Sequence, residues 1–187
     1  MVRLTTKQIV RQSAPVICGV LFISLITGSR LDAAFDLIII DHPVLLILIP
    51  AYINITGDMS DVLSSRLSSY LYKGELDTSF RPFRLFVVNF ISMIAIALTG
   101  FLLAAIFGNL VAGFIFHKSS PWGPLLLTVG LSGFLASSFI SLMMSVVLRF
   151  IYVRGLDPDS IIPSISTSTG DLTGTLLLLF FASRLLT

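Results

Sequence analysis

Hydrophobic residues dominate five long stretches of this 187-residue chain, with short polar connections between them. A helix that crosses a membrane needs about 20 predominantly apolar residues. Five stretches reach that length, the second and fifth only when their polar residues are accepted: about 15–31, 43–72, 83–107 with an apolar continuation to 116, 124–152 and 163–186. We therefore expect an all-α membrane protein with five transmembrane helices. We also expect residues 1–187 to form a single transmembrane domain without a soluble domain.

The composition agrees with a protein that lives in the lipid bilayer. Hydrophobic residues make up 55% of the chain and charged residues 12%, whereas soluble domains carry about 25% charged residues. Mean hydropathy is +0.98. The net charge of +2 is too small to indicate a nucleic-acid partner. The one cysteine, Cys18, excludes an intrachain disulfide, and we expect it to pack as a small apolar residue.

The basic residues predict how the chain is oriented in the membrane. Nine of the twelve Lys and Arg lie in the N-terminal tail, near the end of the second stretch or near the end of the fourth. Those three regions share one side if five helices cross the membrane. Because cytoplasmic loops carry an excess of Lys and Arg, we expect the N-terminus inside and the C-terminus outside.

One phrase of nine residues occurs twice. Residues 50–58 and 163–171 both read P-x5-T-G-D, and each lies inside an apolar stretch. In the expected topology the second helix runs inward and the fifth runs outward, so the two phrases lie on antiparallel helices. An inverted-topology repeat, which is common in transporters, would produce this relation. A carboxylate inside the membrane is expensive and usually marks a substrate or ion pathway.

Each phrase belongs to a polar stripe along one helical face. The stripes comprise Asn54, Asp58, Asp61 and Ser65 on the second helix, Ser164, Ser168, Asp171 and Thr175 on the fifth, and the overlapping line Thr167, Asp171 and Thr175. Their ligand atoms are all oxygen, which suits hard cations such as magnesium or calcium. The two histidines stand alone near helix ends, so no Cys/His set for zinc or copper is present.

Asp171 is the acid most difficult to explain structurally. Twelve uncharged residues separate it from Arg184, which places it well inside the membrane, and no basic residue occurs three or four positions away. The alternative is that Asp171 has a purely structural role, with its carboxylate hydrogen-bonded by Ser168 and Thr167. We expect Asp171 to be the central ion-binding residue.

The remaining acids suggest a second cation site. Asp58 and Asp61 lie toward the inner end of the second helix, and we expect them at the same depth as Asp157 and Asp159, which precede the fifth. Together they would form a cytoplasmic-side cation site. The alternative for Asp58 and Asp61 is a helix break with ion pairs to Arg66 or Lys73, and the alternative for the other two is solvated loop charges.

Small residues recur at four-residue spacing on three helices, where they allow helix backbones to approach closely. On the third and fourth helices we expect them to serve packing within the chain. The fifth helix has Gly170 and Gly174, which we expect to face a second copy of the chain. The stripes are Gly100, Ala104, Gly108 and Ala112, and Gly133, Ser137, Ser141 and Ser145.

Two segments resemble the membrane domain of MgtE-type magnesium channels and of the related animal solute-carrier magnesium transporters. One is residues 57–68, G-D-M-S-D-V-L-S-S-R-L-S, followed by Lys73-Gly74. The other is residues 157–171, with Asp-Pro, a second Pro, hydroxyl residues and an acid. In that family five helices make one unit, and the second and fifth helices of two units line the pore. The resemblance implies that Asp171 is the pore acid, and Asp58 stands where the family usually has Asn. The magnesium-sensing and CBS domains of the bacterial channels do not occur in this sequence.

The resemblance implies transport of a divalent cation, with Mg²⁺ as the transported ion, through a homodimer in the plasma membrane of a prokaryote. It does not imply an enzyme. Combining the resemblance with the polar stripes, we expect the metal to be held by Asp171, Asp58, Thr167, Ser168, Asn54, Asp61, Asp157 and Thr175.

Two other functions remain open at this point. One is a membrane assembly subunit without transport of its own, and the other is a metal-dependent enzyme that resembles the CDP-alcohol phosphatidyltransferases. Asp58, Asp61 and Arg66 fit the motif of those enzymes. Val62 and Ser65 replace its Gly and Ala, however, and the enzyme leaves Asp171 without a role.

Overall fold

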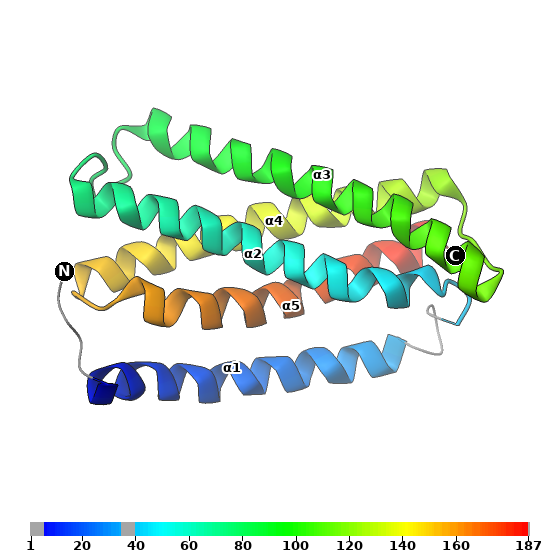
Figure 1. Ribbon diagram of the computed structural model, residues 1–187, viewed down its shortest axis with the longest axis horizontal. Helices are drawn as coiled ribbons and strands as arrows, with labels where there is room; N and C mark the ends of the chain where they lie inside the picture. The colour runs from blue at the N-terminus through cyan, green and yellow to red at the C-terminus, as the bar shows by residue number, and fades with distance from the viewer. Residues whose placement is uncertain (1–5, 35–39, 187) are drawn as a thin grey trace.

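The computed structural model describes residues 6–34 and 40–186, with the backbone alone for residues 6–13, 159 and 160. The described residues form five α-helices and no strand (Figure 1): α1 (Thr6–Ala34), α2 (Val44–Lys73), α3 (Phe83–Phe116), α4 (Trp122–Val153) and α5 (Pro158–Leu185). All five are long and apolar enough to cross a membrane. The expected helical fold is therefore confirmed.

α5 begins earlier than expected, at Pro158 rather than near residue 163, because a proline in the first turn of a helix sacrifices no backbone hydrogen bond. Pro163 lies further inside α5, and Pro50 lies inside α2. α2 continues without a break to Lys73, close to the expected end. Gly74 ends α2 in the left-handed conformation, φ 73°, and its N–H donates to carbonyls of the last turn. This is the usual glycine C-cap.

Successive helices run in alternating directions, so the two ends of the chain lie at opposite ends of the bundle (Figure 1). α2 and α5 lie side by side, and both pack against α4. α3 flanks the pair beside α2, and α1 flanks it beside α5. One side of the α2–α5 pair is thus covered by α4, and the opposite side is left open.

α1 is the most isolated helix, since α5 is the one helix against which it packs among the described residues. The apolar side chains of Leu21, Phe22 and Leu25 are exposed. Cys18 is also exposed, so the expectation that it packs inside the protein is wrong. The reason is tertiary: an apolar helix with a single neighbour leaves most of its surface to lipid.

The small residues of α3 and α4 make close helix contacts within the chain, as expected. A Cβ atom on Gly100 would lie 3.4 Å from Ile55, and one on Gly108 would lie 3.1 Å from Leu48. On α4, a Cβ on Gly133 would lie only 2.4 Å from the ring of the fully buried Phe101. These glycines therefore hold α3 against both α2 and α4.

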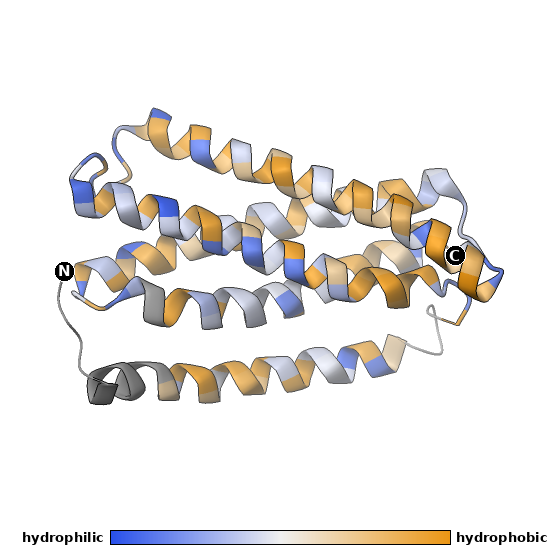
Figure 2. Ribbon diagram, viewed as in Figure 1, coloured by the Kyte–Doolittle hydropathy of each residue, from blue (hydrophilic) through white to orange (hydrophobic). Residues whose placement is uncertain are grey.

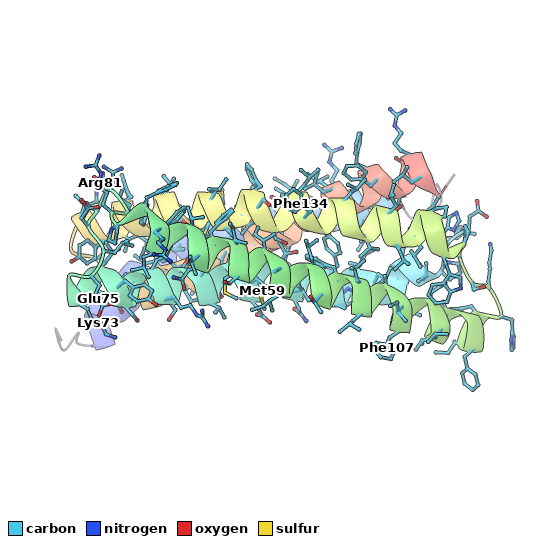
Figure 3. The ribbon with its side chains drawn as sticks, turned by 90° about the horizontal axis from the view of Figure 1, so that it is seen from above. Met59, Lys73, Glu75, Arg81, Phe107 and Phe134 are labelled. Atoms are coloured by element: carbon cyan, nitrogen blue, oxygen red, sulfur yellow. The ribbon has the colours of Figure 1, made fainter. Side chains whose placement is uncertain are left out.

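The helices differ in how many polar residues they carry along their length. Figure 2 shows mostly orange along α3, a mixture of orange and pale colours along α4, and blue positions that interrupt α2 and α5. Lys73, Glu75 and Arg81 lie at the end of the bundle where α2 connects to α3 (Figure 3). Phe107 and Phe134 are exposed along its length. Exposed apolar flanks with charged ends are what a lipid-facing bundle requires.

A polar cluster joins the start of α2 to the connection between α3 and α4. Asn109 is buried and binds the backbone of Ser120 twice, accepting from its N–H at 2.9 Å and donating to its carbonyl at 3.0 Å. The Ser120 hydroxyl lies 3.0 Å from His42 Nδ1. An exposed ion pair between Lys118 and Asp41, 3.6 Å, lies alongside. The cluster ties the first turn of α2 to α3.

Candidate functional site

The two repeated phrases contact each other where α2 and α5 cross. A Cβ atom on Gly170 would lie 3.4 Å from the backbone nitrogen of Gly57, and one on Gly57 would lie 3.5 Å from Cα of Thr167. Both glycines are buried. The two glycines thus mark where the helices approach closely, and α2 and α5 run in opposite directions at this crossing (Figure 1).

The crossing lies about halfway across the bundle. Asp171 is ten residues inside the span Ile161–Leu185, which corresponds to about 15 Å along the helix. The hydrocarbon core of a bilayer is about 30 Å thick. Asp58 directly follows Gly57 and Asp171 directly follows Gly170, so both carboxylates lie close to mid-membrane depth.

This depth corrects one expectation from the sequence. Asp58 does not lie at the depth of Asp157, whereas Asp61, one turn further along α2, lines a cavity together with Pro158. Gly57 lies beside Thr167, which is ten residues or about 15 Å further along α5 than Asp157. α2 continues for another fifteen residues past Asp58 instead of breaking there. The side chain of Asp159 is outside the described part of the chain.

Four of the expected ligands lie at exposed or half-buried positions of α2 and α5, and Thr167 also lines a groove with Ile17 and Leu21 of α1. Asn54, Asp58 and Thr167 are exposed, and Asp171 is half-buried. We call these four residues the polar face. Thr167 donates its hydroxyl to the Pro163 carbonyl at 2.8 Å. The side chains of Asn54, Asp58 and Asp171 have no hydrogen bond or ion pair to any described residue.

The other expected ligands lie elsewhere. Ser168 and Thr175 are buried, with 4% and 2% of their surface exposed, so they point into the protomer. Asp157 lies just before α5, far from the polar face. Asp61 is half-buried, and its carboxylate accepts a hydrogen bond from Ser166.

The alternative explanation for Asp61 was an ion pair with Arg66 or Lys73. The structure instead shows a hydrogen bond from Ser166. Neither Arg66 nor Lys73 forms an ion pair with Asp61. Ser166 was not among the ligands expected from the sequence. Its signal was weak, because it is one hydroxyl among the six residues 164–169, five of which are Ser or Thr.

Gly170 and Gly174 do not form a face for a second copy. Both are buried. A Cβ atom on Gly174 would lie 3.2 Å from the ring of Tyr52, and Gly170 lies against Gly57 and Thr56. The small residues are therefore used for packing within the protomer, and this expectation is wrong.

The polar face alone is an incomplete metal site. The described residues contain no group of three or more His, Cys, Asp or Glu close enough to hold a metal ion. The polar face offers two carboxylates, an amide and a hydroxyl on neighbouring helices. Such oxygen groups suit a hydrated hard cation.

Helices able to cross a membrane, with carboxylates halfway along two of them, define a class of integral membrane proteins that move ions. The sequence matches the MgtE family, described as divalent cation transporters, over residues 49–181, and the chain belongs to this family. The resemblance noted in the sequence is confirmed. Members of the family are transporters rather than enzymes, so the phosphatidyltransferase alternative is not retained.

Two animal relatives have clear but distant similarity. Solute carrier family 41 member 3 of Rattus norvegicus is 27% identical over 131 residues, which cover 68% of this chain and 28% of the relative. The protein of the same name from Mus musculus is 25% identical over 131 residues, which cover 68% of this chain and 27% of the relative. The chain thus spans less than a third of the length of these relatives.

Proposed function

We propose that this protein transports a divalent cation, Mg²⁺, along the polar face of α2 and α5 at the interface of a homodimer. The observation that carries the proposal is the set of unpartnered polar side chains of Asn54, Asp58 and Asp171 at exposed or half-buried positions of a membrane-spanning helix pair. It agrees with the divalent cation transport that describes the family.

An ionised carboxylate is not stable against lipid. On insertion scales an Asp at the centre of a transmembrane helix costs about 2.5–3.5 kcal/mol. Because α4 covers one side of the α2–α5 pair, the open side must be covered by something polar or wet. A second copy, related by a two-fold axis, would bring a second polar face opposite the first. Water and cations would then occupy the space between them.

The polar groups favour Mg²⁺ in a hydrated form. Mg²⁺ gives up water reluctantly and is usually bound through one or two carboxylates and several waters. Two facing Asp171 carboxylates would supply the charge. Asn54 and Thr167 would hydrogen-bond the coordinated waters. Asp58 lies at nearly the same depth and adds negative charge to the pathway.

The membrane orientation in this proposal is N-terminus inside and C-terminus outside, in the plasma membrane of a prokaryote. The positions of the basic residues support the orientation. The antiparallel crossing of the two phrases supports an inverted repeat that relates α2 to α5.

The test is Mg²⁺ flux into liposomes that contain only this protein, followed with an internal Mg²⁺ dye. We expect uptake above that of empty liposomes and loss of uptake in the Asp171→Ala protein. A folded protein without any cation flux would instead favour a membrane assembly subunit, the function that remains as the alternative.

A further inference from the structure

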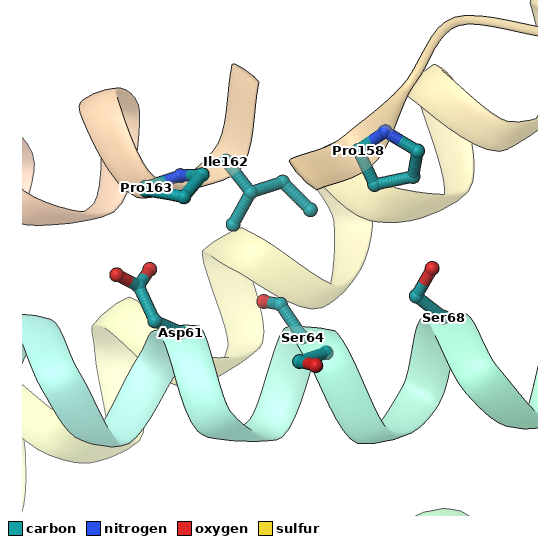
Figure 4. Close-up of a pocket in the computed structure, with 7 residues that line it drawn as sticks. Asp61, Ser64, Ser68, Pro158, Ile162 and Pro163 are labelled. Atoms are coloured by element: carbon teal, nitrogen blue, oxygen red, sulfur yellow. The ribbon is translucent and has the colours of Figure 1, made fainter. Parts of the chain in front are cut away.

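A cavity with both polar and apolar lining residues lies between α2 and the start of α5, nearer the end of the bundle than the polar face (Figure 4). Its volume is about 200 Å³. The lining residues are Asp61, Ser64, Ser65, Ser68, Pro158, Ile162 and Pro163. Asp61, Ser64 and Ser68 all project from α2 toward α5 in Figure 4. The cavity belongs to a single protomer, unlike the proposed dimer pathway.

Ser64 has a hydroxyl that the protein itself does not use. The residue is 2% exposed, and its Oγ makes no hydrogen bond to any described residue. Serine and threonine inside helices normally donate to a carbonyl one turn earlier. Thr56 and Ser60, on the same helix, do so at 2.9 Å each. Tyr52 and Thr128 also have buried hydroxyls without a partner, but of these three residues only Ser64 lines the cavity. A polar occupant of the cavity would satisfy its hydroxyl.

The carboxylate of Asp61 is oriented for a ligand. Ser166 donates to its Oδ1, which holds the carboxylate in place and leaves Oδ2 available. Carboxylates that bind metals are commonly fixed by such a hydrogen bond from a neighbouring group. No Lys, Arg or His lines the cavity, so an anion has no counter-charge there.

We infer that this cavity is a second cation site, which binds Mg²⁺ with most of its water shell through Asp61 and Ser64. Carboxylate, hydroxyl and water oxygens are ligands for hard cations. Water occupies about 30 Å³ per molecule in the liquid, so the cavity has room for an ion with several waters. Mg²⁺ typically keeps such waters and binds through one or two carboxylates.

The position of the cavity suggests its role, which rests on the proposed transport function. Ser68 lies beside Pro158, the first residue of α5, whereas Asp58 lies beside the crossing with α5. A cation that enters from the α4–α5 end of the bundle would meet Asp61 before it reaches Asp58 and Asp171. The cavity would therefore hold an ion next to the pathway at that entrance.

The site can be tested in the full chain after the central acid is removed. In detergent, Mg²⁺ should still raise the Tm of the Asp171→Ala protein, because a ligand that binds the folded state stabilises it. Adding Asp61→Asn, which keeps the shape and the bond from Ser166, should abolish that rise. Adding Ser64→Ala should raise the apparent Kd at least threefold. Ser69→Ala, at an exposed serine outside the cavity, is the matched control and should change nothing.

Three results would overturn the inference. The first is an undiminished rise in Tm with Mg²⁺ in the Asp171→Ala, Asp61→Asn protein. The second is the absence of any rise in Tm with Mg²⁺ in the Asp171→Ala protein. The third is an equal rise in Tm with NaCl at matched ionic strength. If Asp61→Asn does not fold, Ser64→Ala decides alone, because it removes no hydrogen bond within the protomer. Parental transport by Asp171→Ala would refute the proposed pore acid without affecting the Tm test.

Discussion

At the scale of single residues, the chain separates its acids by what surrounds them. Asp58 and Asp171 lack a partner within the described residues, whereas Asp61 accepts a hydrogen bond from Ser166. Unpartnered carboxylates near mid-membrane gain stability only from water, a proton or a cation. We therefore expect substitutions at Asp58 and Asp171 to change ion binding more than folding.

Asp171 should be essential for transport. Two Asp171 carboxylates about 4 Å apart would repel each other by about 4 kcal/mol at an effective dielectric constant near 20, and a divalent ion would cancel both charges. Asp171→Ala should abolish Mg²⁺ flux in liposomes, and Asp171→Asn, which keeps the shape, should lose most of it. Both proteins should fold and dimerise normally, as gel filtration would show. Transport at the parental rate in Asp171→Ala would refute the pore assignment.

Asp58 should strengthen cation binding without being the central ligand. Its carboxylate is exposed at nearly the depth of Asp171, so it adds negative potential to the pathway. Asp58→Ala should reduce the rise in Tm caused by Mg²⁺, measured by thermal unfolding in detergent. Asp77→Ala, at an exposed acid in the α2–α3 connection, serves as the control. An unchanged Mg²⁺ response in Asp58→Ala would remove this residue from the pathway.

At the scale of helices, close packing depends on glycine at particular contacts. Gly57 and Gly170 mark where α2 and α5 approach closely at the repeated phrases, and Gly133 makes room for the ring of Phe101. Van der Waals packing drives helix association in lipid, where the hydrophobic effect between helices is absent. A Cβ at Gly133 would overlap the Phe101 ring, whereas one at Gly57 or Gly170 would make an ordinary van der Waals contact.

Gly133→Ala should destabilise the protein. The added Cβ would lie 2.4 Å from the Phe101 ring, which is fully buried and whose centroid lies 4.6 Å from that of the tilted Tyr52 ring. Overpacking of this kind costs about 1–3 kcal/mol. Gly123→Ala, on the same helix with nothing within 4 Å of its Cβ position, cancels the difference in helix propensity. Unfolding in detergent should show a lower Tm for Gly133→Ala, and equal Tm values would contradict this contact.

At the scale of the whole molecule, the alternation of the five helices places the chain ends at opposite ends of the bundle. The positions of the basic residues predict the membrane orientation. Reporter fusions at the two ends should show the N-terminus inside and the C-terminus outside. Two reporters on the same side would remove both the topology and the inverted repeat.

The assembly is expected to be a dimer, because one polar face supplies too few ligands to surround a hydrated ion. In mild detergent the protein mass should be twice the 20.4 kDa of one chain. Cross-linking through cysteine at Asn54, in a Cys18→Ser background, should join two chains through α2. A monomer that still transports Mg²⁺ in liposomes would exclude the dimer pathway.

The sequence by itself determined the five helices, the family and the repeated phrase. Each depends on local composition: long apolar runs must be helical in lipid because every backbone hydrogen bond has to be satisfied within the segment. The choice of Asp171 as the central acid also came from the sequence, through its distance from any basic residue. It remains a prediction.

Only the tertiary structure decided which residues share a site. The sequence placed Asp58 level with Asp157, but helix register depends on contacts such as Gly57 with Gly170, and no periodicity along one helix reveals those. Burial decided that Ser168 and Thr175 face inward, and helix neighbours decided that Cys18 lies exposed. The bond between Ser166 and Asp61 joins residues 105 positions apart, a distance over which local sequence carries no information about contact.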